Sequence, residues 1–265
     1  MKFGKEQILS ALLLLGFGAA VSLSGFYGGT FGGTGTGNLE NASHLENNAD
    51  TTKLPGPSSA DIVEIGEALG ATKLNFEQLE EQNPDIYAWI TIPGTKIDYP
   101  VLQKGDAKDP YDNFYLDHQV DLTEGLPGVI YSQPVNGRDF MDSVTVLYGH
   151  NMKNGEMFSG LHFFADKDFF AQNRQVIIET PEKTFTYEIF AAVDFSDELL
   201  PYVYDFTKSI EVRRHLADVR KCEGNFREEI EISEGDKILV LSTCYSDRAE
   251  RRLLVEAVLT EEQNQ

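Results

Sequence analysis

The sequence predicts a mainly β domain, a barrel or sandwich of about eight short strands, behind an apolar N-terminus and a polar linker. Short runs rich in β-branched and aromatic residues recur from residue 86 onward, with turn-forming residues between them. A few longer segments have the apolar spacing of helices instead. With 41% hydrophobic residues in a chain of 265, there is enough apolar material for the core of one such domain.

The N-terminus predicts a membrane segment. Lys2 and Lys5 precede an uncharged apolar stretch at 8–26, and about 20 such residues span the hydrocarbon core of a bilayer. Because lysines stay on the cytoplasmic side, the rest of the chain is expected outside the cell. We expect residues 1–26 to be a single-pass anchor in the cell membrane. Small residues before Gly25 leave a cleaved signal peptide as the alternative.

A polar linker is predicted over residues 27–60, because Gly, Thr, Asn and Ser dominate there and offer little to bury. The globular domain is expected over 61–265. The formal net charge of −21 argues against nucleic acid as a partner, since nucleic acid binds basic surfaces. It also argues against a peripheral electrostatic hold on anionic lipids.

The first half of the domain is expected to hold one helix and four short strands. The segment 61–85 has helical spacing, interrupted near Gly70. A turn at Pro93 and Gly94 separates the first two strands. The four expected strands occupy residues 86–92, 98–103, 128–132 and 143–149.

The second half is expected to hold two helices and two strand pairs. The first helix, at 156–173, places Met157, Leu161 and Phe164 on one face. The remaining elements are a hairpin of strands at 175–180 and 184–195, a helix over about 206–222, and a final strand pair at 237–243 and 252–259.

Cys244 is the candidate nucleophile, at the end of the apolar run ILVLST. The other cysteine is Cys222, near the end of the inserted helix, and nothing in the spacing demands a disulfide. An unpaired thiol in an exported protein is a candidate reactive group. To react as a thiolate, it needs a base or a cationic neighbour.

Among the five histidines, His150 is the strongest candidate for that base. It directly follows a predicted strand, and functional groups collect at strand ends. His118, in a loop, is a second position that could lie near a site. The other three are interpreted as unrelated to chemistry: His44 in the linker, His162 packed or at the surface of a helix, and His215 solvated on the inserted helix.

Two arginines, Arg251 and Arg252, open the last strand. Since side chains alternate faces along a strand, only one of them can face Cys244. That arginine could stabilise an oxyanion, because a guanidinium cannot act as a base. The alternative interpretation of Arg252 is a rim arginine at a strand start that is solvated or paired with Glu250.

Metal and nucleotide sites are not predicted. The sequence has neither HExxH nor CxxC, and the acidic cluster DAKDPYDN does not match an EF-hand loop. No glycine-rich phosphate loop follows a strand. We therefore expect no metal ion and no cofactor.

Several ordered motifs together resemble the sortases, cysteine transpeptidases of the Gram-positive surface. LYGHNMKNGEMFSGLHFF, ILVLSTC and RLLVEA resemble the family, and AWITIPGTKIDYPVLQ and DNFYLDH are similar to its class B branch. The resemblance extends from about residue 73 to 260. It implies a sortase-like β-barrel of about eight strands, with an N-terminal helix and a long helix inserted before the last strand pair.

By this resemblance, Cys244 is the nucleophile and His150 the general acid and base. Arg252, which stands directly before LLV, is the residue that stabilises the oxyanion. Thr243 and Ser242 of the same motif would lie beside the substrate.

The sequence departs from the family pattern in two places. Val240 stands where the family usually has threonine, a position without a chemical role. The segment KDPYDN is similar to the lid motif of pilin-assembling class C sortases. Because it lies inside the core of the domain, it is interpreted as a loop.

The resemblance also implies a reaction. Cys244 would cleave a sorting motif near the C-terminus of a surface protein, as a cysteine peptidase does. An amine of a peptidoglycan precursor, or a pilin lysine, would then resolve the thioacyl enzyme. From the residues alone, two other classes stay open: a cysteine hydrolase of the cell surface, and a non-catalytic adhesion module with an incidental thiol.

Overall fold

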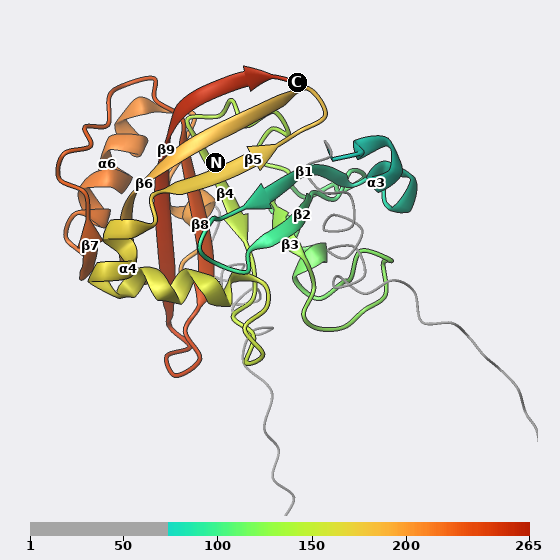
Figure 1. Ribbon diagram of the computed structural model, residues 1–265, viewed down its shortest axis with the longest axis horizontal. Coiled ribbons are helices and arrows are strands. Elements are labelled where there is room, and N and C mark those ends of the chain that lie inside the picture. Colours follow the sequence, from blue (N-terminus) through green and yellow to red (C-terminus); the bar gives the residue numbers. More distant parts are fainter. Residues whose placement is uncertain (1–73) are drawn as a thin grey trace, which may run out of the picture. The chain divides into compact units, whose positions relative to one another are not determined.

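The computed structural model describes residues 74–265, which form a β-barrel with helices on its outside (Figure 1). The strands are β1 (Ile86–Thr91), β2 (Asp98–Leu102), β3 (Ile130–Ser132), β4 (Val144–Tyr148), β5 (Gln175–Glu179), β6 (Lys183–Ser196), β7 (Gly224–Phe226), β8 (Ile238–Cys244) and β9 (Arg251–Asn264). The helices are α3 (Phe76–Gln82), α4 (Lys167–Gln172), α5 (Leu200–Val203) and α6 (Ser209–Val219), with two 3₁₀ helices, η1 (Phe114–Leu116) and η2 (Phe158–Ala165).

Eight of the strands close into a ring. The order is β5-β1-β2-β3-β4-β8-β9-β6-β7, and β5 also pairs with β6, so that β7 alone lies outside the ring. The β2–β3 and β4–β8 pairs are parallel, and the other pairs are antiparallel. The predicted barrel of about eight strands is thereby confirmed.

Two apolar clusters hold the barrel and its helices together. The inner cluster takes residues from all eight ring strands, for example Leu239 and Leu241 of β8. The outer cluster takes the alternate residues, such as Val240, together with residues of the surrounding helices such as Val219 of α6. Both faces of β8 are therefore buried, which explains why its sequence is a continuous apolar run instead of an alternating one.

The expected elements correspond to observed ones with a few differences. The segment 156–173 is not one helix: η2 and α4 meet at Asp166, whose carboxylate caps α4 by accepting the backbone N–H groups of Asp168 and Phe169 at 3.0 and 2.8 Å. The inserted helix is α6, preceded by the single turn α5. Strand β7 has only three residues and was not expected.

The predictions for the N-terminus lie mostly outside the described residues. Helix α3 lies within the helix expected over 61–85, but it begins only at Phe76, after its N-cap Asn75, and ends at Gln82. The expected anchor at 1–26 and linker at 27–60 precede the first described residue. Among residues 74–265, no helix is both long enough and apolar enough to cross a membrane.

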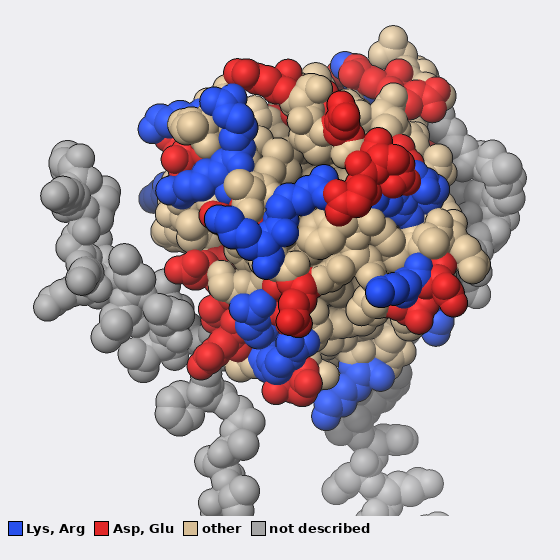
Figure 2. Space-filling model, turned by 90° about the vertical axis from the view of Figure 1, so that its left-hand side faces the viewer, with Lys and Arg blue, Asp and Glu red and all other residues tan. Residues whose placement is uncertain are grey.

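The surface beside α6 and β7 carries both signs of charge. These two elements lie on one side of the barrel in Figure 1, and Figure 2 shows basic and acidic side chains interleaved on that side. Arg213 pairs with Glu234, and Arg220 with Glu228 at 2.7 Å. Despite the strongly acidic composition, this face therefore does not present a field of a single sign that would steer a charged partner.

The sequence suggested that His215 is solvated. In the structure it is fully buried, on the face of α6 that packs against the barrel. Its Nε2 lies 3.0 Å from Oε1 of Glu256 on β9, and both side chains have no exposed surface. The rings of Phe195, Tyr204 and Phe206 surround the imidazole edge-on. The pair fixes α6 onto the barrel through a polar contact inside an apolar cluster.

We predict that His215→Ala lowers the free energy of unfolding by about 3 kcal/mol, because it leaves the Glu256 carboxylate buried without its partner. Denaturant titration measures the loss. The matched control is Arg213→Ala on the same helix, an exposed ion pair whose loss is expected to cost less than about 1 kcal/mol. Equal losses in the two variants would contradict the role given to the buried pair.

Candidate active site

Three neighbouring strand ends bring the predicted residues together. In the parallel β4–β8 pair, Tyr148 lies opposite Ser242. His150 and Cys244 each follow two positions later, so the same register sets them side by side. In the antiparallel β8–β9 pair, Cys244 lies directly opposite Arg252.

Strand alternation places the thiol and the guanidinium on the outer face of the barrel. Cys244 shares its face with Val240, and Arg252 shares its face with Leu254, both members of the outer cluster. Each of the two site residues is partly exposed, as is His150. The three groups are therefore open to a ligand that lies across the ends of β4, β8 and β9.

The imidazole of His150 is oriented by a backbone carbonyl. Its Nε2 lies 2.7 Å from the carbonyl oxygen of Leu116 in η1. A carbonyl only accepts, so Nε2 carries the hydrogen in this contact. Nδ1 is then the ring nitrogen that can take up and release a proton, and the backbone at His150 is itself fixed by the N–H of Phe158 at 2.9 Å.

Two side chains hold the backbone of Cys244. Asn151 donates through Nδ2 and His162 through Nε2 to the carbonyl oxygen of Cys244, each at 3.0 Å. Burial lowers the pKa of His162, so the neutral ring with its hydrogen on Nε2 is the form favoured here. The thiol itself is free, as is that of Cys222.

The sequence interpretation of His162 missed this contact. We expected an α-helix with 3.6 residues per turn, whereas η2 has the tighter 3₁₀ turn, which places residues three apart in one row. His162 is one such turn after Ser159, whose hydroxyl contacts the backbone of Met152 in the loop after His150. Two polar residues three positions apart, Ser159 and His162, are the signal that could have indicated that His162 faces the loop after His150.

Arg252 is held by the turn that joins β8 to β9. Its Nη1 donates to the carbonyl oxygens of Ala249 and Arg251 at 2.8 and 2.9 Å. Nη2 and Nε remain as donors for an oxygen that gains charge. Pairing with Glu250, part of the alternative interpretation, is not among its contacts in the described part of the chain.

Arg251 has a different partner and a different face. Its Nε lies 2.5 Å from Oδ1 of Asp194 on β6, and its Nη2 contacts the Asp194 carbonyl at 2.7 Å. Arg248 also pairs with Asp194. The two neighbouring arginines are therefore separated in the way that strand alternation predicts, with Arg252 beside the thiol.

The remaining candidates lie close to the site without joining it. Thr243 is buried, and its hydroxyl donates to the Gly149 carbonyl at 2.8 Å, a contact that ties β8 to β4. Its role beside the substrate, and that of Ser242, stay predictions. His118 follows η1, stacks on Phe114 at 3.8 Å and contacts the Phe114 carbonyl through Nδ1.

Within residues 74–265, no cluster of side chains could hold a metal ion.

A thiol, an imidazole and a guanidinium on adjoining strand ends outside an eight-stranded barrel form the arrangement expected of the sortase class of protein, and comparison with known proteins supports that class. The family model of the sortase domain matches residues 90–260. The chain belongs to the sortase family of transpeptidases.

Within the family, the similar proteins are class B sortases. Sortase B of Listeria monocytogenes is 30% identical over 179 residues, which is 68% of this chain and 70% of that protein. Sortase B of Staphylococcus aureus is 26% identical over 187 residues, or 69% and 74% of the two chains. The X-ray structure of Clostridium perfringens sortase B superposes with a TM-score of 0.63 at 30% identity, covering 71% of this chain and all of that one.

We predict that Arg252→Ala lowers the rate of thioacyl formation about 100-fold to 1,000-fold, the usual effect of losing one oxyanion donor. Thermal stability should change little. Lysine should restore little activity, because an ammonium lacks the planar fork of the guanidinium. Single-turnover acylation by a peptide substrate measures the rate.

Arg251→Ala is the matched control, because the two residues are neighbours with the same charge. We expect a small change in rate and a modest loss of stability, since the partner Asp194 loses one of its two arginines. If Arg251→Ala is the slow variant and Arg252→Ala is not, the assignment of faces is wrong.

Proposed function

We propose that this chain is a membrane-anchored extracellular transpeptidase that cleaves a sorting motif near the C-terminus of surface proteins. It would join the new carboxyl group to an amine of the cell wall or to a pilin lysine. The observation that carries the proposal is the side-by-side placement of His150, Cys244 and Arg252 on three adjoining strand ends. Membership of the sortase family supports it.

The first half of the reaction is that of a cysteine peptidase. The thiolate of Cys244 attacks the carbonyl carbon of the scissile peptide bond, and Arg252 stabilises the negative charge on its oxygen. The C–N bond breaks as Nδ1–H of His150 gives its proton to the leaving amine. A thioester between Cys244 and the new C-terminus remains.

In the second half, an amine takes the place of the departed one. The acceptor amine loses a proton to Nδ1 of His150 and attacks the thioester carbon. The oxyanion forms again beside Arg252, and its collapse releases the Cys244 thiolate and an amide. Proton count and charge return to their starting values, so the cycle needs neither a metal ion nor a cofactor.

The acceptor has two candidate sources. One is a peptidoglycan precursor, and the other is a lysine of another surface protein. A Streptococcus pyogenes class B sortase, 26% identical with a TM-score of 0.59, is described as involved in pilus biogenesis. Both sources supply a primary amine. An assay with each amine in turn as the acceptor distinguishes them.

Hydrolysis is the second candidate function, because water can resolve the same thioester. The partial exposure of Cys244 supports it as a side reaction. The adhesion-module alternative is disfavoured, because the domain matches an enzyme family along most of its length.

We predict that Cys244→Ala abolishes cleavage of a sorting-motif peptide while the thermal unfolding curve stays that of the wild type. Cys244→Ser should also fail, because a hydroxyl is far less nucleophilic at neutral pH. A thiol-directed probe should label Cys244 faster than Cys222, whose pKa is raised by burial. Cys222→Ala is the control and should keep full turnover.

Product analysis with and without an added amine separates the two functions. A transpeptidase gives an amide whose yield rises with the concentration of amine, whereas a hydrolase gives the free acid throughout. Wild-type turnover by Cys244→Ala would contradict both.

We predict for the N-terminus that the full-length chain fractionates with membranes and that deletion of residues 1–60 releases an active, soluble domain. The apolar stretch at 8–26 supports this, since it has the length of a membrane span. Fractionation of expressing cells with N-terminal sequencing measures it. A mature chain that begins at Gly25 would contradict the anchor, and an inactive truncation would mean that the deleted segment belongs to the domain.

A further inference from the structure

The carbonyl that orients His150 belongs to a very short element. Leu116 is the last residue of η1, a three-residue 3₁₀ helix in the long connection between β2 and β3. A single turn of helix is not stable by itself, because one or two hydrogen bonds do not repay the ordering of the backbone. Its position must therefore be set by contacts with the rest of the domain.

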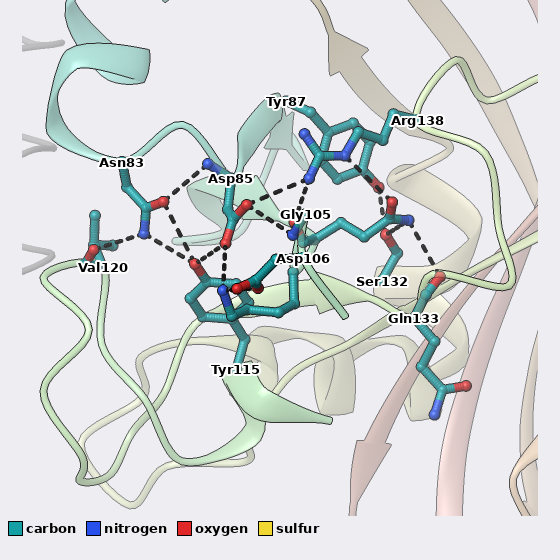
Figure 3. Close-up of polar contacts among 12 residues, drawn as sticks. Asn83, Asp85, Tyr87, Gly105, Asp106, Tyr115, Val120, Ser132, Gln133 and Arg138 are labelled. Atoms are coloured by element: carbon teal, nitrogen blue, oxygen red, sulfur yellow. Dashed lines mark hydrogen bonds and ion pairs between the residues drawn. The ribbon is translucent and has the colours of Figure 1, made fainter. Parts of the chain in front are cut away.

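The residue before Leu116 is anchored in a buried polar cluster. Tyr115 is 1% exposed, and its hydroxyl donates to Oδ2 of Asp85 at 2.7 Å. Nδ2 of Asn83 donates to the same hydroxyl at 3.0 Å, and also to the Val120 carbonyl at 2.8 Å. Figure 3 shows the ring of Tyr115 pointing from η1 into this cluster.

Asp85 is itself fixed from several sides. It directly precedes β1, and its Oδ1 accepts the N–H of Gly105 at 2.8 Å and a contact from Nη2 of Arg138 at 3.4 Å (Figure 3). Lys104 lies 3.7 Å from Oδ2. Burial and the adjacent carboxylate raise the pKa of Tyr115, so its hydroxyl keeps its proton and stays a donor.

A glycine packs directly against two backbone carbonyls of η1. Gly128 has φ of +64°, and a Cβ placed on it would lie 2.5 Å from the Leu116 carbonyl oxygen and 2.6 Å from that of Tyr115. The next residue, Val129, donates its N–H to the Tyr115 carbonyl at 3.2 Å. Only a residue without a side chain leaves room for the two carbonyls where they are.

We propose that Asp85 and Tyr115 are positioning residues for the acid–base group: through η1 they hold the Leu116 carbonyl against Nε2 of His150. The hydrogen bonds of Tyr115 and the close contact with Gly128 both restrict where that carbonyl can lie. The hydrogen of the imidazole is thereby kept on Nε2, and Nδ1 is kept for the substrate. This inference rests on the proposed function in one respect: the proton that Nδ1 gives and takes is the one exchanged during transpeptidation.

The alternative is that the cluster only stabilises the fold. The two interpretations differ in what a single missing hydroxyl does to His150. A purely structural cluster would give a lower melting temperature with an unchanged imidazole. A positioning cluster would change the tautomer and the titration of His150 even in a variant that remains fully folded at the temperature of the assay.

The test compares two tyrosines of the same buried network. Tyr115→Phe removes the hydroxyl that reaches Asp85. The control, Tyr87→Phe, removes the hydroxyl that contacts Ser132 at 2.7 Å, in the same region but without contact to η1 (Figure 3). Nitrogen NMR of labelled histidine reports the tautomer and titration of His150, with His118→Gln used to assign the neighbouring ring.

We expect Tyr115→Phe to weaken the Nε2–H preference of His150 and to lower kcat about 10-fold to 100-fold, as expected for a small displacement of a catalytic group, with KM nearly unchanged. Tyr87→Phe should alter neither. Gly128→Ala, which displaces the Leu116 carbonyl directly, should reproduce the change in the tautomer without touching the hydroxyl.

An unchanged His150 spectrum in Tyr115→Phe, or an equal change in Tyr87→Phe, would overturn the inference. Because the spectrum is recorded without substrate, it decides the positioning role by itself. If the wild-type enzyme fails to join peptides to amines, it is the proposed function that fails, and the comparison of the two tyrosine variants still stands.

Discussion

The parallel pairing of β4 with β8 is the interaction on which the rest of the site depends. Its backbone ladder, extended by the N–H of Gly149 to the Ser242 carbonyl and by the Thr243 hydroxyl to the Gly149 carbonyl, continues as far as His150 and Cys244. A shift of one residue in this register would turn the thiol toward the barrel interior and leave the imidazole outside. Because both faces of β8 are buried in apolar clusters, such a shift would require the side chains of both clusters to be repacked.

The sequence predicted those parts of the molecule that regular periodicity encodes. Strands β8 and β9 could be recognised from their apolar runs, and the opposite faces of Arg251 and Arg252 follow from strand geometry alone. The choice of Arg252 came from the resemblance to a family, because the residues after it are all apolar and do not distinguish the faces. In the structure Arg251 pairs with Asp194 and Arg252 lies opposite Cys244, while the role of Arg252 in catalysis stays a prediction.

The remainder could not be predicted because it depends on contacts between segments distant in sequence. His162 reaches the Cys244 carbonyl from 82 positions away, and Tyr115 reaches Asp85 across 30. His215 looked solvated because its neighbours Arg213 and Arg214 are charged, yet a single face of α6 is buried and this histidine lies on it. In each case a polar residue contacts a partner that no local pattern indicates.

Barrel closure has a consequence for how a peptide can be recognised. Proteins with an open sheet can capture an extended peptide by adding it as a further strand, with main-chain hydrogen bonds that ignore its sequence. Here, within residues 74–265, the ring strands are paired on both sides, and the remaining edge belongs to the three-residue β7. On the proposed function, a peptide at Cys244 would instead be held by side chains and loops on the outer wall, which favours discrimination between sequences over general affinity for extended chains.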